Sequence, residues 1–293
     1  MIREKPPRAL VDISLISVAL IWGATFVLVK RALDDVSTLF FLALRFAAAA
    51  VALAVVFRRS LRSTDFAIGL RAGGLAGACL FAGYVLQTFG LKFTSASKAG
   101  FITGLYIPLV PLFGSIVYRR LPQFVELVGV AMAFAGLTLM SVEREVLSMN
   151  RGDLLVSGCA VAYAFHILVL GRYAQSVDAG FLAVVQIATA AVLAALTFWW
   201  AEPVRIRWSA DVWIALAVTG LLATALAFFV QTWAQRWSSP TRTALIFSTE
   251  PVFAWATSYV VAREVLPARA IAGAALILAG ILLVELKPLR ARF

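Results

Sequence analysis

Three ionisable side chains stand out in the long apolar stretches of this 293-residue chain: Arg45, Glu250 and His166, which is the single histidine. A charge at membrane depth is costly, so such residues are candidates for function. Arg45 could pair with a carboxylate of a bound molecule, form a structural bond between helices, or extend its charge to the membrane interface. Glu250 precedes Pro251, which removes a backbone donor and can kink a helix. A carboxylate there could exchange a proton, cap a helix or pair with an arginine, or bind an amine.

His166 and a set of neutral side chains extend this candidate site. Imidazole changes its charge near neutral pH, so His166 could act as a protonation switch, or it could bond to a neighbouring backbone group or hydroxyl. The neutral candidates are polar or aromatic residues that could line a central cavity: Trp22, Thr25, Tyr84, Gln87, Tyr106, Gln186 and Gln231. Each of them alone could equally serve helix packing.

The sequence lacks the patterns of several other classes of protein. Cys79 and Cys159 lie in apolar runs without metal-ligand spacing, and a single histidine excludes a paired-histidine site, so we expect no metal and no cofactor. A nucleophile elbow and a phosphate-binding glycine loop are also absent, so we expect neither an enzyme nor an ATP-driven pump. The net charge of +11 comes from short basic clusters between apolar runs, which fits membrane topology better than nucleic-acid binding.

Composition places these residues in a membrane. The chain is 62% hydrophobic and 14% charged, whereas a soluble domain has about 25% charged residues. A membrane-spanning helix needs about 20 mostly apolar residues, and this requirement predicts an all-α integral membrane protein of ten transmembrane helices. They are expected at 11–31, 38–57, 67–91, 97–118, 123–142, 153–172, 178–200, 211–233, 242–262 and 268–286. Gly69, Gly73 and Gly77 recur at helical spacing, which predicts close contact with another helix.

An even number of spans puts both termini on one side of the membrane. Lys and Arg are more numerous on that side, above all in the N-terminal tail and in 58–71, and this excess predicts that both termini face the cytoplasm. We therefore expect a multi-pass protein of the inner (plasma) membrane, N-in and C-in. Its expected partners are the lipid bilayer and a small-molecule substrate, with no nucleic acid, and it could be a monomer or a homodimer.

The chain contains an internal repeat. Sliding it by 144 residues aligns Gln87-Thr88 with Gln231-Thr232 and Tyr106 with Glu250, with eleven identities over about 56 positions. Earlier in each half the offset is 141, which aligns Arg45 with Gln186. One membrane domain made of two five-helix halves, 1–146 and 147–293, is therefore predicted. Because five is odd, the second half should enter the membrane from the opposite face, giving an inverted repeat of the kind found in secondary transporters.

These features together resemble the drug/metabolite transporter superfamily, and within it the EamA family of ten-helix permeases. The similar stretches are Trp22-Gly23-Ala24-Thr25-Phe26, Leu44-Arg45-Phe46, the run from Lys98 to Tyr106, Glu250-Pro251-Val252-Phe253, and the glycine-rich segments 129–136 and 273–280. The resemblance implies secondary transport, usually efflux of amino acids or other metabolites, through a central cavity lined by helices 1–4 and 6–9. Drug or toxic-compound efflux is one alternative, and a channel or sensing protein is another.

Overall fold

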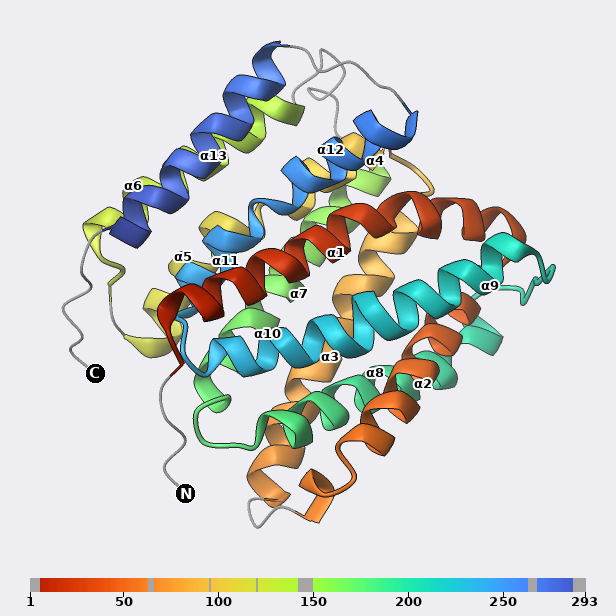
Figure 1. Cartoon of the computed structure of the whole chain (residues 1–293). Helices are drawn as coiled ribbons and strands as arrows, with labels where there is room; N and C mark the ends of the chain where they lie inside the picture. The colour runs from red at the N-terminus through yellow and green to blue at the C-terminus, as the bar shows by residue number, and fades with distance from the viewer. Residues whose placement is uncertain are drawn as a thin grey trace.

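The computed structural model of the chain describes residues 6–62, 66–94, 96–119, 121–141, 150–262 and 268–286. In these ranges the regular structure is helical, apart from one isolated antiparallel β-bridge between Val36 and Ile206. The helices pack side by side (Figure 1), and the start of α1 and the end of α13 both lie on the left of that view. The predicted boundary between residues 146 and 147 falls outside the described residues.

The helices follow one another with short connections. The first half holds α1 (Arg8–Asp35), α2 (Thr38–Val56), the 3₁₀ turn η1 (Ser60–Arg62), α3 (Phe66–Gly90), α4 (Ala96–Thr103), α5 (Tyr106–Tyr118) and α6 (Phe124–Ser141). The second half holds α7 (Arg151–Tyr173), α8 (Ala179–Ala201), α9 (Ala210–Ala217), the π-helix η3 (Val218–Leu226), α10 (Ala227–Gln235), α11 (Pro240–Phe247), α12 (Glu250–Ala262) and α13 (Ala268–Leu286).

Six of the described helical segments are long and apolar enough to cross a membrane: Arg8–Thr25, Thr38–Val56, Phe66–Gly90, Arg151–Tyr173, Ala179–Ala201 and Ala210–Gln235. Tyr106–Tyr118, Phe124–Leu139 and Ile271–Val284 are apolar but shorter. The fold is thus that of an all-α membrane protein over the described residues, and the full count of ten spans stays a prediction.

Several helices start where the sequence provides a capping side chain. Asn150 and Asp153 form a reciprocal capping box at the start of α7, with bonds of 3.0 and 2.7 Å. Asp178 accepts from the N–H of Phe181 at the start of α8, and Ser239 precedes Pro240 at the start of α11. Such caps satisfy backbone donors that no helical carbonyl can reach.

Two of the predicted continuous helices, 97–118 and 242–262, are wrong in detail because each is broken in the middle. The first is divided at residues 104–105 into α4 and α5, and the second at residues 248–249 into α11 and α12. Pro108 and Pro251 lack the N–H that would continue the ladder across these points. At the second break, Ser248 and Thr249 also bond through their hydroxyls to the carbonyls of Leu245 and Ile246. Local bonds of this kind compete with the regular helix.

A third predicted helix, 211–233, departs from α geometry in its centre. Nine residues, Val218–Leu226, form a π-helix between α9 and α10. The N–H of Ala227 bonds to the carbonyl of Leu222, five residues earlier, and to the carbonyl of Thr224, three residues earlier. π-helical turns are rare and often lie at functional sites.

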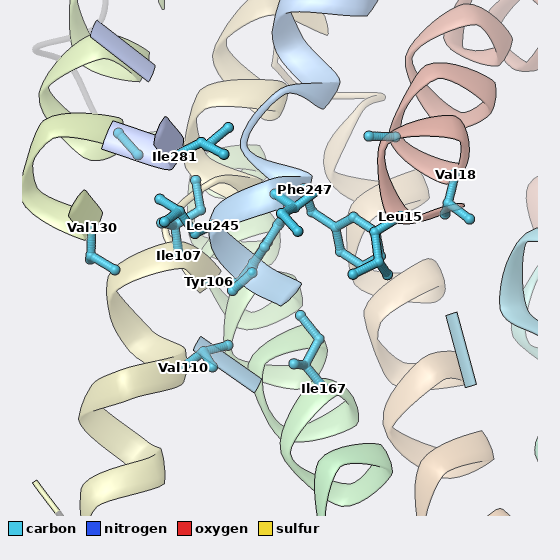
Figure 2. Packing of buried hydrophobic residues seen from close by; sticks show 14 of the residues in the cluster. Leu15, Val18, Tyr106, Ile107, Val110, Val130, Ile167, Leu245, Phe247 and Ile281 are labelled. Carbon is cyan, nitrogen blue, oxygen red and sulfur yellow. The ribbon is translucent and has the colours of Figure 1, made fainter. Parts of the chain in front are cut away.

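The largest apolar cluster joins elements from both halves. Figure 2 shows Leu15 of α1, Tyr106 of α5, Ile167 of α7, Phe247 of α11 and Ile281 of α13 packed around one centre. All five are at most 8% exposed. The break residues of α4–α5 and α11–α12 therefore lie next to a packed interior rather than at the lipid surface.

Glycines bring two pairs of helices into close contact. Gly129 and Gly136 on α6 face Gly280 and Gly273 on α13, so that a Cβ at Gly136 would lie 2.4 Å from the carbonyl oxygen of Gly273. These two helices run side by side at one edge of the molecule (Figure 1). The predicted contact of Gly69, Gly73 and Gly77 is confirmed, since this ladder packs against α8.

Replacing Gly77 by alanine should destabilise the protein, whereas the same change at Gly74 should not. A Cβ at Gly77 would lie 2.3 Å from the carbonyl oxygen of Gln186, while no heavy atom of the described residues lies within 4 Å of a Cβ at Gly74. We expect Gly77→Ala to lower the free energy of unfolding by about 1–3 kcal/mol, and Gly74→Ala to leave it unchanged or raise it by up to about 1 kcal/mol. Thermal unfolding of both variants in detergent tests this; equal effects would contradict the contact.

Candidate functional site

Arg45 lies at the centre of a polar contact between the two halves. It is the eighth residue of α2 and is 4% exposed. Its Nε donates to the hydroxyl of Thr224 on η3 at 2.7 Å, and its Nη2 donates to the hydroxyl of Tyr84 on α3 at 3.0 Å. The guanidinium also lies over the Tyr84 ring, 4.8 Å from its centroid. Among the described residues, no carboxylate lies within 4.0 Å of this guanidinium.

Aromatic rings surround the Arg45 contact. Trp22 packs on Phe228 and Phe247, with ring centroids 5.3 and 4.9 Å apart, and its Nε1 donates to the carbonyl of Ala223 at 2.9 Å. Tyr84 packs against Tyr163 at 5.9 Å and Phe228 at 6.3 Å. Helices α1, α3, α7, α10 and α11 thus each contribute a ring to one region.

Glu250 and Tyr106 occupy matching places in the two broken helices. Each is the first residue after its break, and the offset of 144 aligns them. Glu250 is partly buried, and its backbone carbonyl lies against Gly23 of α1. Among the described residues, none donates a hydrogen bond to its carboxylate or forms an ion pair with it. Its position at the start of α12 is favourable, because the helix dipole stabilises negative charge there.

His166 belongs to a chain of hydrogen bonds inside the second half. Its Nε2 lies 2.9 Å from Oε1 of Gln186, and Nε2 of Gln186 donates to the hydroxyl of Thr232 at 2.8 Å. Thr232 in turn donates to the carbonyl of Phe228. Gln186 is fully buried, and His166 is 2% exposed. The partner of His166 is therefore a side-chain amide rather than a backbone group or hydroxyl.

The remaining predicted residues divide into two groups. Gln87 joins the central region, since it donates to the hydroxyl of Thr103 at 3.1 Å and accepts from Tyr163 at 3.4 Å. Thr25 instead bonds to the carbonyl of Trp22 on its own helix. Gln231 donates to Gln235 and is 1% exposed, and its Oε1 has no hydrogen-bond partner among the described residues. The structure gives Thr25 and Gln231 no bond to Arg45 or Glu250 in the described part of the chain.

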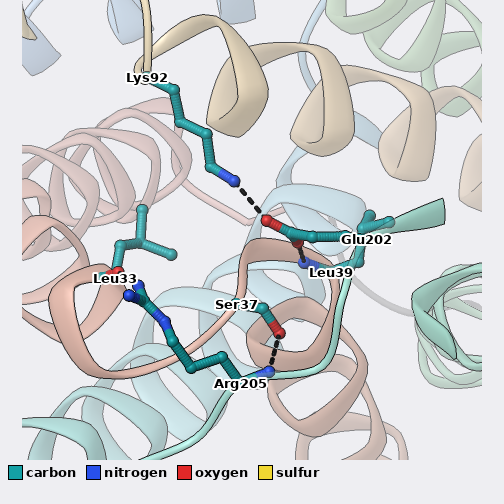
Figure 3. Close-up of polar contacts among 6 residues, drawn as sticks. All are labelled: Leu33, Ser37, Leu39, Lys92, Glu202 and Arg205. Atoms are coloured by element: carbon teal, nitrogen blue, oxygen red, sulfur yellow. Dashed lines mark hydrogen bonds and ion pairs between the residues drawn. The ribbon is translucent and has the colours of Figure 1, made fainter.

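A second set of contacts joins the halves at the end of α1, and we call residues 33–39, Lys92 and 202–207 the loop latch. The N–H of Ser37 donates to the carbonyl of Arg205, and the N–H of Arg207 donates to the carbonyl of Asp35. Glu202, 11% exposed at its side chain, forms an ion pair with Lys92 and accepts from the N–H of Leu39 at 3.0 Å (Figure 3).

Another cross-half contact lies near the start of α1. Nη2 of Arg242 on α11 donates to Oδ2 of Asp12 at 2.7 Å. Asp12 and Asp35 are 23 positions apart on one helix, so about 35 Å separates this pair from the loop latch. The two halves are thus joined by charged contacts at both ends of α1 and by the Arg45 contact between them.

Comparison with known proteins decides the family. The EamA-like transporter family matches residues 9–142 and, a second time, residues 150–286. The chain belongs to this family. It is therefore a multi-pass membrane transporter. The side chains of Phe26, Lys98 and Phe101, which lie in the stretches that suggested the family, fall outside the described residues.

Relatives of this EamA-like transporter are similar over nearly the whole chain. An uncharacterized transporter of Archaeoglobus fulgidus is 33% identical over 284 residues, which cover 97% of this chain and 88% of that protein. The uncharacterized transporter YyaM of Bacillus subtilis is 23% identical over 92% of both chains. A solved crystal structure superimposes with a TM-score of 0.78 at 19% identity, covering 96% of this chain and 98% of that one. At that identity the likeness shows the fold alone.

The central region around Arg45 contains residues that sequence reasoning missed: Thr224, the carbonyl of Ala223, Tyr163 and Phe228. Thr224 sits in an apolar run and looks like an ordinary helical residue, because nothing in the local sequence marks a π-helix. Tyr163 offered a usable signal, since it is polar and falls in the middle of the predicted helix 153–172. Phe228 could have been found by the repeat, which aligns it with Tyr84 at the offset of 144.

Removing the amide of Gln186 should destabilise this EamA-like transporter through the groups left without a partner. We expect Gln186→Leu to lower the free energy of unfolding by about 1–3 kcal/mol, because His166 and Thr232 lose their bonds. The double variant Gln186→Leu/His166→Leu should lose less than the sum of the single variants. Thr197→Val is the matched control on α8, since in the described part of the chain that hydroxyl bonds to carbonyls of its own helix alone. Strictly additive losses in thermal unfolding would contradict the chain of bonds.

Proposed function

We propose that the protein is a secondary active transporter that exports amino acids or similar small metabolites across the inner (plasma) membrane by alternating access. The observation that carries this proposal is the pair of broken helices. Their breaks, at 104–105 and 248–249, are 144 residues apart, which is the offset of the internal repeat. Transporters with inverted repeats use such discontinuous helices to build the substrate site between the halves.

Contacts between equivalent helices support the inverted repeat itself. A two-fold axis brings the elements beside it against their equivalents, and α6 packs on α13 while α2 packs on α8. The glycine contacts obey the same symmetry, because the contact of Gly129 with Gly280 corresponds, after shifting by 144, to that of Gly273 with Gly136. The two halves proposed, 1–146 and 147–293, are the units that this axis would relate.

The proposed cargo site is the central region where Arg45, Tyr84 and Glu250 meet the aromatic rings. Its candidate residues stay those of the sequence: Trp22, Thr25, Arg45, Tyr84, Gln87, Tyr106, His166, Gln186, Gln231 and Glu250. Glu250 is the candidate for coupling to protons, since its carboxylate has no charged partner among the described residues and stands at the start of a half-helix. Exchange of one cargo for another is the alternative source of energy.

A drug or toxic-compound carrier is the second candidate function. It is favoured by the rings of Trp22, Tyr84, Tyr163, Phe228 and Phe247, which offer apolar faces to an amphipathic molecule. A channel or sensor is less well supported, because neither requires two matched breaks. Both termini are proposed to face the cytoplasm.

Counterflow in proteoliposomes tests the proposed function. Vesicles are loaded with unlabelled amino acids, other metabolites or aromatic cations, and the entry of labelled counterparts is followed with and without a pH gradient. We expect saturable exchange of one class of compound. In Glu250→Gln the stimulation by a pH gradient should disappear, because an amide cannot carry the proton, while exchange at equal pH should persist.

Glu126→Gln is the matched control, because Glu126 lies on α6, away from the central region, and accepts only from the nearby N–H of Gln123. It should keep the pH response. Flux that is not saturable and shows no counterflow would contradict a carrier. A pH response that survives in Glu250→Gln would move proton coupling to another residue.

Alternating access also requires that the loop latch opens. In a variant whose native cysteines are replaced, Lys92→Cys/Glu202→Cys should be joined by a short bifunctional thiol reagent, because the native side chains form an ion pair. We expect cross-linking to reduce exchange at least about tenfold, and each single-cysteine variant with the same reagent to be unaffected. Exchange at an unchanged rate after complete cross-linking would show that this contact stays closed throughout the cycle.

A further inference from the structure

The guanidinium of Arg45 has N–H donors that no described residue accepts, and it is buried, where an unsatisfied donor costs free energy. Arginine carries five N–H donors, and the described residues accept two of them, one at Nε and one at Nη2. Both acceptors are neutral hydroxyls. The Nη1 amino group and one N–H of Nη2 remain, and together they form the end of the side chain that can bind a carboxylate with two parallel bonds.

The missing counter-charge is unusual for a residue that is 4% exposed. A buried charge without a partner costs several kcal/mol, and buried arginines in proteins are normally paired. Arg242, which is also well buried, does have a carboxylate partner, since its Nη2 lies 2.7 Å from Oδ2 of Asp12. Over the described residues, the chain therefore supplies a carboxylate to Arg242 near the start of α1 and none to Arg45.

Two residues hold the guanidinium so that its terminal N–H groups stay free. Thr224 takes the Nε–H from the side, and Tyr84 supports one face through its ring and binds Nη2. Thr224 can do this because the π-helix η3 presents Ala223 and Thr224 together to the first half, the first to Trp22 and the second to Arg45. Thr224 is fully buried, which leaves no solvent to compete for its hydroxyl.

In the second half, the residue equivalent to Arg45 has hydrogen-bond partners for both of its polar side-chain atoms. The repeat places Gln186 where the first half has Arg45. Gln186 uses its oxygen on His166 and its nitrogen on Thr232, both in its own half. The two equivalent positions therefore differ. Gln186 is neutral and bonds through both its oxygen and its nitrogen, whereas Arg45 is cationic and has N–H donors that no described residue accepts.

We propose that Arg45 is a carboxylate-binding subsite, in which the Nη1 and Nη2 edge takes the two oxygens of a carboxylate on the cargo while Thr224 fixes the side chain through Nε. This inference rests on the proposed function and names the chemistry of its cargo: the transported molecule carries a carboxylate. Thr224 is a positioning residue, since it acts on the cargo only through Arg45.

The test uses the purified full-length protein in detergent and acetate as the minimal carboxylate, with thermal unfolding as the readout. A ligand that binds only the folded state raises the unfolding temperature in a saturable way. Sodium acetate is compared with sodium chloride at equal ionic strength and with acetamide, which has the same shape without the charge. We expect stabilisation by acetate alone.

Variants assign the effect to Arg45 and Thr224. Arg45→Gln should raise the half-saturating acetate concentration at least about tenfold, which is the loss of about one charged hydrogen bond. Thr224→Val should raise it about three- to tenfold, and Thr224→Ser, which restores the hydroxyl, should return it to within about twofold of the native value. Arg151→Gln, an exposed residue at the start of α7, is the matched control and should behave as the native protein.

The acetate measurements decide the inference without reference to transport. Acetate stabilisation that is absent from the native protein, matched by acetamide, or kept in Arg45→Gln overturns the subsite. If Arg45→Gln does not fold, Arg45→Lys replaces it and should weaken acetate binding, because an ammonium lacks the two-pronged edge; equal binding by lysine would overturn the end-on geometry. Equal effects of Thr224→Val and Thr224→Ser would overturn the role of Thr224. Counterflow that succeeds only with cargo lacking a carboxylate would leave the proposed transport function standing and remove this subsite.

Discussion

Every irregularity in this fold depends on one constraint, which is that backbone polar groups inside a bilayer must find partners within the protein. Two broken helices and a nine-residue π-helix each disturb the regular ladder. They can exist only where protein, rather than lipid, surrounds them. The break between α11 and α12 is closed by the hydroxyls of Ser248 and Thr249, both buried, and the carbonyl of Ala223 in η3 is met by the indole of Trp22. The irregular segments therefore gather at the interface of the halves, and that is where the candidate site lies.

The same constraint explains why the centre of the molecule is asymmetric although the architecture repeats. Gly129, Gly136 and their counterparts on α13 make equivalent contacts, so the scaffold follows the repeat closely. At the centre the equivalent positions hold different side chains: Arg45 against Gln186, and Tyr106 against Glu250. Buried polar groups must each be satisfied individually, and an amide can be satisfied by His166 and Thr232 whereas a guanidinium has donors left over. A pair of identical halves could not place one cation and one anion at two different points of a shared site.

The sequence predicted the parts of this structure that depend on local composition. Helices such as α2, α8 and α13 lie close to their predicted ranges because apolar length is a local property of the sequence. The breaks were missed because Gly104, Ser248 and Thr249 stand inside long apolar runs, and hydropathy does not register a backbone turn. The π-helix was missed for a similar reason. Arg45, Tyr84 and Gln87 were predicted as site residues on type alone and do lie near one another, but the role of Thr224 depends on a contact over 179 positions that no local pattern contains. The contact of His166 with Gln186 likewise joins two helices, α7 and α8, and no local pattern contains it.

The contacts between the halves at the end of α1 are weaker than those in the centre of the molecule. This difference affects which contacts can open during the proposed transport cycle. At the loop latch the Lys92 side chain is 41% exposed, and an exposed ion pair contributes only about 0–1 kcal/mol. Backbone bonds such as Ser37 to Arg205 lie in connections rather than in helices and can be exchanged for bonds to water. In the centre, Arg45 and Thr224 are buried, so their contact has no such replacement unless a ligand supplies it. A cargo carboxylate on Arg45 would provide that replacement, since it would compensate the guanidinium while the halves move. Separating the two halves at the loop latch then costs little free energy with or without cargo. Separating them at Arg45 and Thr224 depends on bound cargo, and a carrier needs this dependence.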